Sequence, residues 1–184
     1  MKKLAFLTLL ALALAIASCG NSSPTNTTTT AATGNWLAQF TGGTGGASEI
    51  NFVTGFTVSG ANGTSEPLDI TGFAFINNGA CFASGLDNEH LSGSASITTG
   101  STGQVTGTMN YTVVSIIPAG NTLSMTGTLT GTSNGTTTKV GTLSNGIVQG
   151  TWTLNGGGGD TSCGGQQGNF LMCQTPVGGV CPTP

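Results

Sequence analysis

The densest group of chemistry-bearing side chains in this chain is the tetrapeptide Asp87-Asn88-Glu89-His90. It holds two carboxylates and the only histidine, residue types that bind calcium or a transition metal. No further ligand set is visible, so we expect a solvated loop before a strand and no metal site. A Ser-His-Asp or Cys-His arrangement would also depend on this one histidine, with no orienting partner. The sequence therefore predicts no catalytic residues, no enzyme activity and no cofactor.

The N-terminus has the pattern of an export signal. Lys2 and Lys3 precede an uninterrupted apolar run from Leu4 to Ile16, as in the charged and apolar regions of a signal peptide. The run is shorter than the roughly 20 apolar residues of a membrane span. We therefore expect residues 1–18 to be removed from an exported protein.

The sequence after this run, Ile16-Ala17-Ser18-Cys19-Gly20, resembles the lipobox of bacterial lipoproteins. The resemblance implies cleavage before Cys19 by signal peptidase II. It also implies a diacylglyceryl thioether on the Cys19 sulfur and an amide-linked acyl chain such as palmitate. Two or more acyl chains give stable membrane anchoring. In that family an aspartate after the cysteine retains the protein in the inner membrane, and Gly20 at this position implies the outer membrane of the cell envelope.

Composition limits what the exported chain can bind. Residues 19–34 have no charged residue and no aliphatic side chain larger than alanine, so we expect a flexible tether behind the lipidated cysteine. Without Lys2 and Lys3, only Lys139 remains against six acidic residues. Phosphate binding needs clustered Lys or Arg, so a nucleic-acid partner is excluded. The expected partners are the membrane, through the lipid anchor, and a small ligand or a cell-envelope component.

Four cysteines follow Cys19: Cys81, Cys163, Cys173 and Cys181. They contain no Cys-x-x-Cys pair, so zinc binding is not expected. An even number in an exported chain predicts two disulfides, with three connectivities open. We favour Cys173–Cys181, which closes a short Pro-Val-Gly-Gly turn, and Cys81–Cys163, whose long loop would stabilise the fold by about 4 kcal/mol.

Apolar and polar residues alternate through much of the chain, as in Asn121–Gly131, where Leu123, Met125 and Leu129 share one side. One glycine interrupts the apolar side of this and similar runs; these glycines are Gly93, Gly107, Gly127 and Gly150. Inward-facing glycines let strands curve and make room for bulky neighbours in small barrels.

Asn-Gly pairs between the alternating runs indicate hairpins. We expect strands near residues 35–41, 48–59, 68–77, 89–99, 103–116, 121–131, 136–144, 146–155 and 167–174. The predicted fold is all-β, an antiparallel up-and-down meander that closes into a small barrel of about eight to ten strands, with a two-sheet sandwich as the alternative. The barrel domain would span residues 35–174, followed by a disulfide-stapled tail at 175–184.

A second resemblance rests on Gly34–Phe40, on repeated Gly-Thr motifs and on Gly150–Phe170. These segments are similar to a loose group of uncharacterised Gly/Thr-rich bacterial lipoproteins, which implies no activity. The Gly-x-Trp of Gly34–Trp36 also resembles the first strand of lipocalin-like and avidin-like barrels, an analogy of architecture alone.

Two functions fit this sequence. A lipid-anchored, non-catalytic barrel would have a solid core and a structural or surface-interaction role, whereas a binding module would hold a small apolar or amphipathic ligand inside. In both cases aromatic side chains line the interior: Trp36, Phe52, Phe56, Phe73, Phe75, Tyr111 and Trp152. Filling of the core is the expected role.

Overall fold

A computed structural model describes residues 29–32, 34–44, 47, 49–83, 88–117, 119–134, 141–156, 163–175 and 181. The proposed signal peptide, Cys19 and most of the tether lie outside the described residues, as do Asp87 and Lys139.

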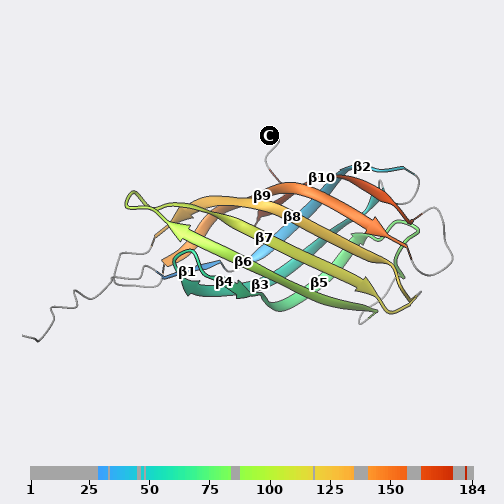
Figure 1. Ribbon diagram of the computed structural model, residues 1–184, viewed down its shortest axis with the longest axis horizontal. Coiled ribbons are helices and arrows are strands. Elements are labelled where there is room, and N and C mark those ends of the chain that lie inside the picture. Colours follow the sequence, from blue (N-terminus) through green and yellow to red (C-terminus); the bar gives the residue numbers. More distant parts are fainter. Residues whose placement is uncertain are drawn as a thin grey trace, which may run out of the picture.

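The described chain is all-β, as predicted (Figure 1). Its strands are β1 (Thr29–Ala32), β2 (Asn35–Gly42), β3 (Asn51–Ala61), β4 (Ser65–Pro67), β5 (Asp69–Asn77), β6 (Glu89–Thr99), β7 (Gln104–Ser115), β8 (Thr122–Ser133), β9 (Gly141–Asn155) and β10 (Gln166–Gln174). No helix among the described residues has the length and hydropathy of a membrane span.

The strands form an antiparallel meander that curls on itself. Hydrogen-bonded ladders run from β3 through β2, β10, β9, β8 and β7 to β6. The return is made by one bent stretch of chain, because β4 pairs with β6 while β5 pairs with β3. At the bend, the Leu68 amide donates to the Gly93 carbonyl at 3.0 Å. In the described residues no ladder joins β5 to the first half of β6, so the barrel is partly open along this seam.

Inward-facing glycines lie beside large side chains in the same cross-strand row. One row runs Gly93, Tyr111, Met125, Trp152 and Gly168 from β6 to β10. The next row runs Met109, Gly127, Gly150 and Phe170. The Trp152 indole lies over Gly168 and donates to the Thr41 carbonyl at 3.1 Å. The glycines therefore make room for large residues, which agrees with the curved arrangement predicted from their spacing.

Strands β1 and β9 differ from the sequence-based expectation. β1 lies inside the segment that was expected to be a tether. Its backbone pairs antiparallel with the end of β3 and parallel with the start of β9. The first described strand therefore begins at Thr29, before Asn35. The two strands expected on either side of Asn145-Gly146 are one strand, β9, in which Asn145 has a φ of 53° opposite a register shift in β8. This Asn-Gly pair forms a bulge and not a hairpin turn.

Two disulfides hold the loops and the tail, with the pairing favoured from the sequence. Cys81–Cys163 joins the loop after β5 to the residues before β10, and both cysteines are completely buried. Cys173–Cys181 fastens the tail to the outer face of β10. There Leu37, Cys173 and Cys181 form a small apolar cluster with Ile147 and Leu171, outside the main core. Cys181 therefore covers part of the outer face next to β2, while residues 176–180 and 182–184 of the expected tail lie outside the described residues.

Candidate functional site

The barrel interior is filled by the aromatic side chains that were predicted to line it. Five of the seven are at most 1% exposed: Trp36, Phe52, Phe56, Tyr111 and Trp152. Phe73 and Phe75, on β5 beside the open seam, are partly buried and pack against this core. Phe40, Phe82 and Phe170 belong to the same core, although the sequence analysis did not select them. Phe40 lies between polar residues in an alternating run, which was the signal available, whereas Phe170 precedes Leu171 and Phe82 lies outside the strands between Cys81 and Ala83.

These rings contact one another closely. Trp36 stacks on Phe56 with centroids 5.1 Å apart, and Phe52 lies 4.9 Å from Phe73 and 5.7 Å from Tyr111. Contacts of this kind are favourable beyond the area that they bury. The aromatic rings therefore pack against one another in the core.

Two linked hydrogen bonds run from the core to the wall of the barrel. Thr54 Oγ1 donates to the Gly72 carbonyl at 3.0 Å and lies 2.8 Å from the Tyr111 hydroxyl. Because the threonine proton is used by Gly72, Tyr111 is the donor of the second bond. Burial raises the pKa of Tyr111 to about 12. These hydrogen bonds connect Tyr111 in the interior to β3 and β5.

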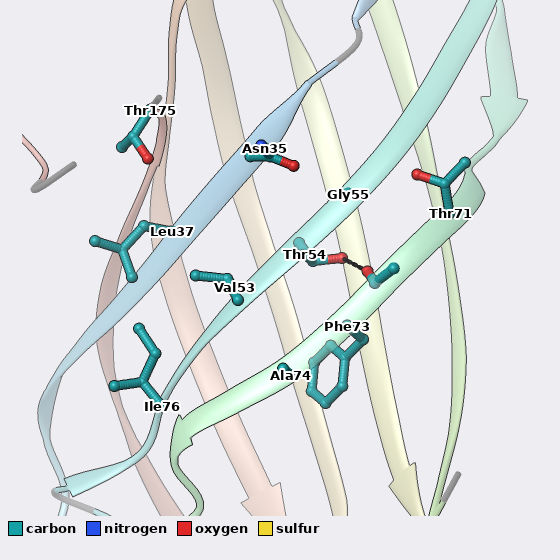
Figure 2. A pocket seen from close by; sticks show the side chains of 11 residues that line it. Asn35, Leu37, Val53, Thr54, Gly55, Thr71, Phe73, Ala74, Ile76 and Thr175 are labelled. Atoms are coloured by element: carbon teal, nitrogen blue, oxygen red, sulfur yellow. Dashed lines mark hydrogen bonds between the residues drawn. The ribbon is translucent and has the colours of Figure 1, made fainter. Parts of the chain in front are cut away.

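A groove of about 350 Å³ lies on the outer face of β2, β3 and β5 (Figure 2). Leu37 on β2, Val53 on β3 and Ile76 on β5 gather on the same side of this view. Leu37 is the cross-strand partner of Val53, and Val53 is the partner of Ala74. The complete lining is Asn35, Leu37, Val53, Thr54, Gly55, Thr71, Gly72, Phe73, Ala74, Ile76 and Thr175.

Two bulges in β5 shape this groove. The register with β3 shifts between Asn51 and Phe52 and again between Gly55 and Phe56, which leaves Ile76 and Thr71 as the extra residues on β5. Bulges bend a strand and redirect its side chains. Between them Gly55 pairs with Gly72, so the floor has no side chain from either residue. A Cβ added at Gly72 would meet nothing within 4 Å, and the floor is therefore hollow.

The groove is apolar and exposed. Ile76 is 63% exposed and Val53 is 38% exposed, two of the four large hydrophobic side chains that are exposed among the described residues. Leu37, by contrast, is shielded by the cluster with Cys173 and Cys181. No lining residue carries a charge. Such a surface can bind neutral aliphatic groups, and the Asn35 amide and the Thr71 hydroxyl are among the polar groups that line it.

A second hollow, of about 590 Å³, lies on the outer face of β2, β9 and β10. Most of the side chains that line it are polar: Gln39, Thr41, Gln149, Thr151 and Asn169. None of the exposed large hydrophobic residues lies in it. We therefore take the apolar groove on β2, β3 and β5 as the candidate site.

The group Asp87–His90, at which no metal or catalytic site was expected, is described only from Asn88 onward. Glu89 and His90 are consecutive in β6 and point to opposite faces, and His90 is exposed. Asp87 lies outside the described residues. Among the residues that the structure describes, no three His, Cys, Asp or Glu side chains are grouped as metal ligands.

Sequence reasoning missed the groove itself. Val53, Ala74 and Ile76 carried no motif, and they meet only because of the β3–β5 register and its bulges. Comparison with known proteins adds no further site residues, since no family model, curated protein or solved structure matches this chain.

Proposed function

We propose that this protein is a lipoprotein of the cell envelope, anchored to the outer membrane through Cys19, and that its barrel is a non-catalytic interaction module. The exposed aliphatic groove on β2, β3 and β5 would dock a neutral apolar segment of a partner protein. The observation that carries the proposal is the contrast between an interior of buried, closely packed aromatic rings and this uncharged outer groove. Exposed apolar surface on a folded domain commonly marks an interaction site.

The partner is a polypeptide and not a glycan, judged by the side chains available. The lining residues include no Trp or Tyr, and Phe73 is the only aromatic among them. Its ring packs with Phe52 and Phe75, so the groove offers no flat aromatic surface on which a sugar ring could stack. Aliphatic side chains and a floor of paired glycines suit an extended peptide with short apolar side chains.

The segment between the proposed anchor and the first strand is short. Nine residues lie between Cys19 and Thr29, the first residue of β1. Fully extended, the stretch from Cys19 to Thr29 spans up to about 35 Å. The barrel would thus stay close to the membrane surface, with its side wall accessible to another envelope protein.

Site-specific photo-crosslinking in the producing cells tests this proposal. A photoreactive amino acid at Ile76 should give one discrete adduct, and the same group at Thr108, exposed on β7, should not. Gly72→Val should abolish the Ile76 adduct, because valine fills open space in the floor of the groove without meeting another atom at Cβ. Equal adducts at both positions, or an adduct that persists in Gly72→Val, would rule out this groove as the docking site.

The interior-ligand alternative has its own test. Titration of the mature protein with N-phenyl-1-naphthylamine, a small apolar probe, would quench Trp36 and Trp152 if the interior admitted it. We expect no saturable quenching, since both rings are at most 1% exposed and packed against other side chains. Saturable quenching that Gly72→Val left unchanged would favour a ligand in the barrel interior.

A further inference from the structure

The three strands that carry the groove contain one charged residue, Asp69 at the start of β5. Asp69 is exposed and pairs with Thr57 in β3. By strand alternation Thr57 faces the same side as Val53 and Gly55, so Asp69 lies on the outer face at the glycine end of the groove. The docking surface therefore has a carboxylate at one end.

A second carboxylate lies toward the other end. Glu49 is exposed and precedes the start of β3 by two residues. Because β3 and β5 are antiparallel, the start of β3 lies next to the end of β5, where Ile76 is located. The nine residues of β5 extend over about 26 Å at 3.3 Å per residue. The apolar groove is thus bounded by two acidic groups about one strand length apart.

No basic group in the described residues offsets these charges. The only lysines of the chain are Lys2, Lys3 and Lys139, all outside the described residues, and the chain has no arginine. His90 lies on β6 and not on the strands of the groove. Among the described residues, this face therefore has an acidic group toward each end and uncharged side chains between them.

From this charge distribution we infer that the docked partner segment is an extended peptide with an aliphatic centre and basic residues on both flanks. The inference rests on the function proposed above and specifies the kind of partner. Flanking lysines or arginines would pair with Asp69 and Glu49, while an acidic segment would be repelled by both. Charges at the rim of an interface mainly steer association and select among partners.

Two synthetic peptides test the charge preference, both acetylated and amidated. One has the sequence Lys-Lys-Val-Thr-Val-Thr-Val-Lys-Lys, and its match replaces each lysine by glutamate. Binding to the purified mature protein is measured by fluorescence anisotropy at low salt. We expect the lysine-flanked peptide to bind roughly tenfold more tightly, since each exposed ion pair contributes a factor of up to about five. In about 0.5 M NaCl, where the screening length falls to about 4 Å, the preference should largely disappear.

Variants assign the effect to the two carboxylates. Asp69→Asn combined with Glu49→Gln should reduce the preference to about twofold or less. The matched control is Glu66→Gln on β4, which removes an acidic residue that pairs with β6 and not with the groove strands. A preference that survives the double variant, or that Glu66→Gln removes equally, would overturn the inference.

The remaining outcomes separate this inference from the proposed function. If both peptides bind equally and Gly72→Val blocks both, the groove docks peptides and only the charge preference is wrong. If Gly72→Val blocks neither peptide, the groove is not the docking site and both conclusions fail. If neither peptide binds, the inference is overturned, because the probe has the chemistry that it specifies, and the crosslinking at Ile76 still decides the proposed function.

Discussion

The ring of Phe170 occupies the space that a side chain at position 127 would need. A Cβ added at Gly127 would lie 2.9 Å from Phe170 Cζ and 2.7 Å from the carbonyl oxygen of Gln149. Gly150 lies between these two residues in the same cross-strand row and has no side chain to separate them. Two adjacent glycines therefore let one phenylalanine extend across β9 to β8.

Gly127→Val should destabilise the fold. Valine has the better strand propensity, so on a flat, open strand it would be neutral or stabilising. Here it would push against a buried ring and a backbone carbonyl, and overpacking of this kind costs about 1–3 kcal/mol. The measurement is the free energy of unfolding of the oxidised mature protein in guanidinium chloride.

The control for this change is Thr126→Val, the neighbouring residue on the exposed side of β8. It gives up one exposed hydrogen bond, from Thr126 Oγ1 to Asn110 Oδ1, and should change stability by less than about 0.5 kcal/mol. A Gly127→Val protein as stable as the wild type, or more stable, would contradict the packing described here.

The glycine rows could be predicted because they depend on spacing alone. Alternation assigns Gly93, Gly107, Gly127 and Gly150 to the apolar side of their strands, and short turns make successive strands neighbours. β6 to β8 and most of β9 agree with this reasoning. The disulfides could be anticipated similarly, since Cys173 and Cys181 are close in sequence and leave Cys81 and Cys163 as partners.

The groove could not be predicted in this way, for a physical reason. It depends on the extra residues Thr71 and Ile76 in β5, and a bulge changes which residues face outward without leaving a distinct sequence signal. β1 was missed because it contributes backbone hydrogen bonds to β3 and β9 and not an alternating apolar pattern. Asn-Gly pairs commonly form hairpin turns, but Asn145-Gly146 forms a bulge within β9. The pairing of β9 with its neighbouring strands decides between the two structures.

The two disulfides should differ in their contribution to stability. Replacing Cys81 and Cys163 together by alanine opens a loop with a separation of 82 residues and should cost about 4 kcal/mol on the loop-entropy model. Replacing Cys173 and Cys181 opens a separation of 8 residues and should cost about 2 kcal/mol. Denaturation of the two double variants measures both losses. An equal or reversed order would mean that native contacts near the bridges outweigh the loop entropy.

The proposed anchor predicts the mass of the mature N-terminus. The membrane-extracted protein should begin at Cys19 and carry a diacylglyceryl group and an amide-linked acyl chain, which intact-mass and peptide mass spectrometry resolve. Cys19→Ser should yield a protein that is unprocessed or free of lipid. An unmodified Cys19, or a mature chain that begins elsewhere, would remove the anchor from the proposal and leave the groove argument unchanged.

Tyr111 gives a spectroscopic measure of how dry the barrel interior is. It is the only tyrosine of the chain, so the absorbance change near 295 nm on raising the pH reports this residue alone, and Tyr111→Phe supplies the blank. In the native protein the pKa should be about 12, and in denaturant it should return to the ordinary tyrosine value of 10.0. A native midpoint near 10 would mean that water reaches the hydroxyl.

The same shift predicts how stability depends on pH. The folded pKa of Tyr111 lies above the unfolded one, so below about pH 10 both states keep the proton and this group adds no pH dependence. Between about pH 10 and 12 the unfolded state loses its proton first, and the native state should lose about 2–3 kcal/mol relative to it. Tyr111→Phe should flatten this part of the stability curve, although it starts about 1 kcal/mol lower because Thr54 loses one hydrogen-bond partner. If the stability curves of the wild type and Tyr111→Phe stay parallel through pH 12, the phenol is not shielded from solvent. The interior around Tyr111 would then not be a closely packed core.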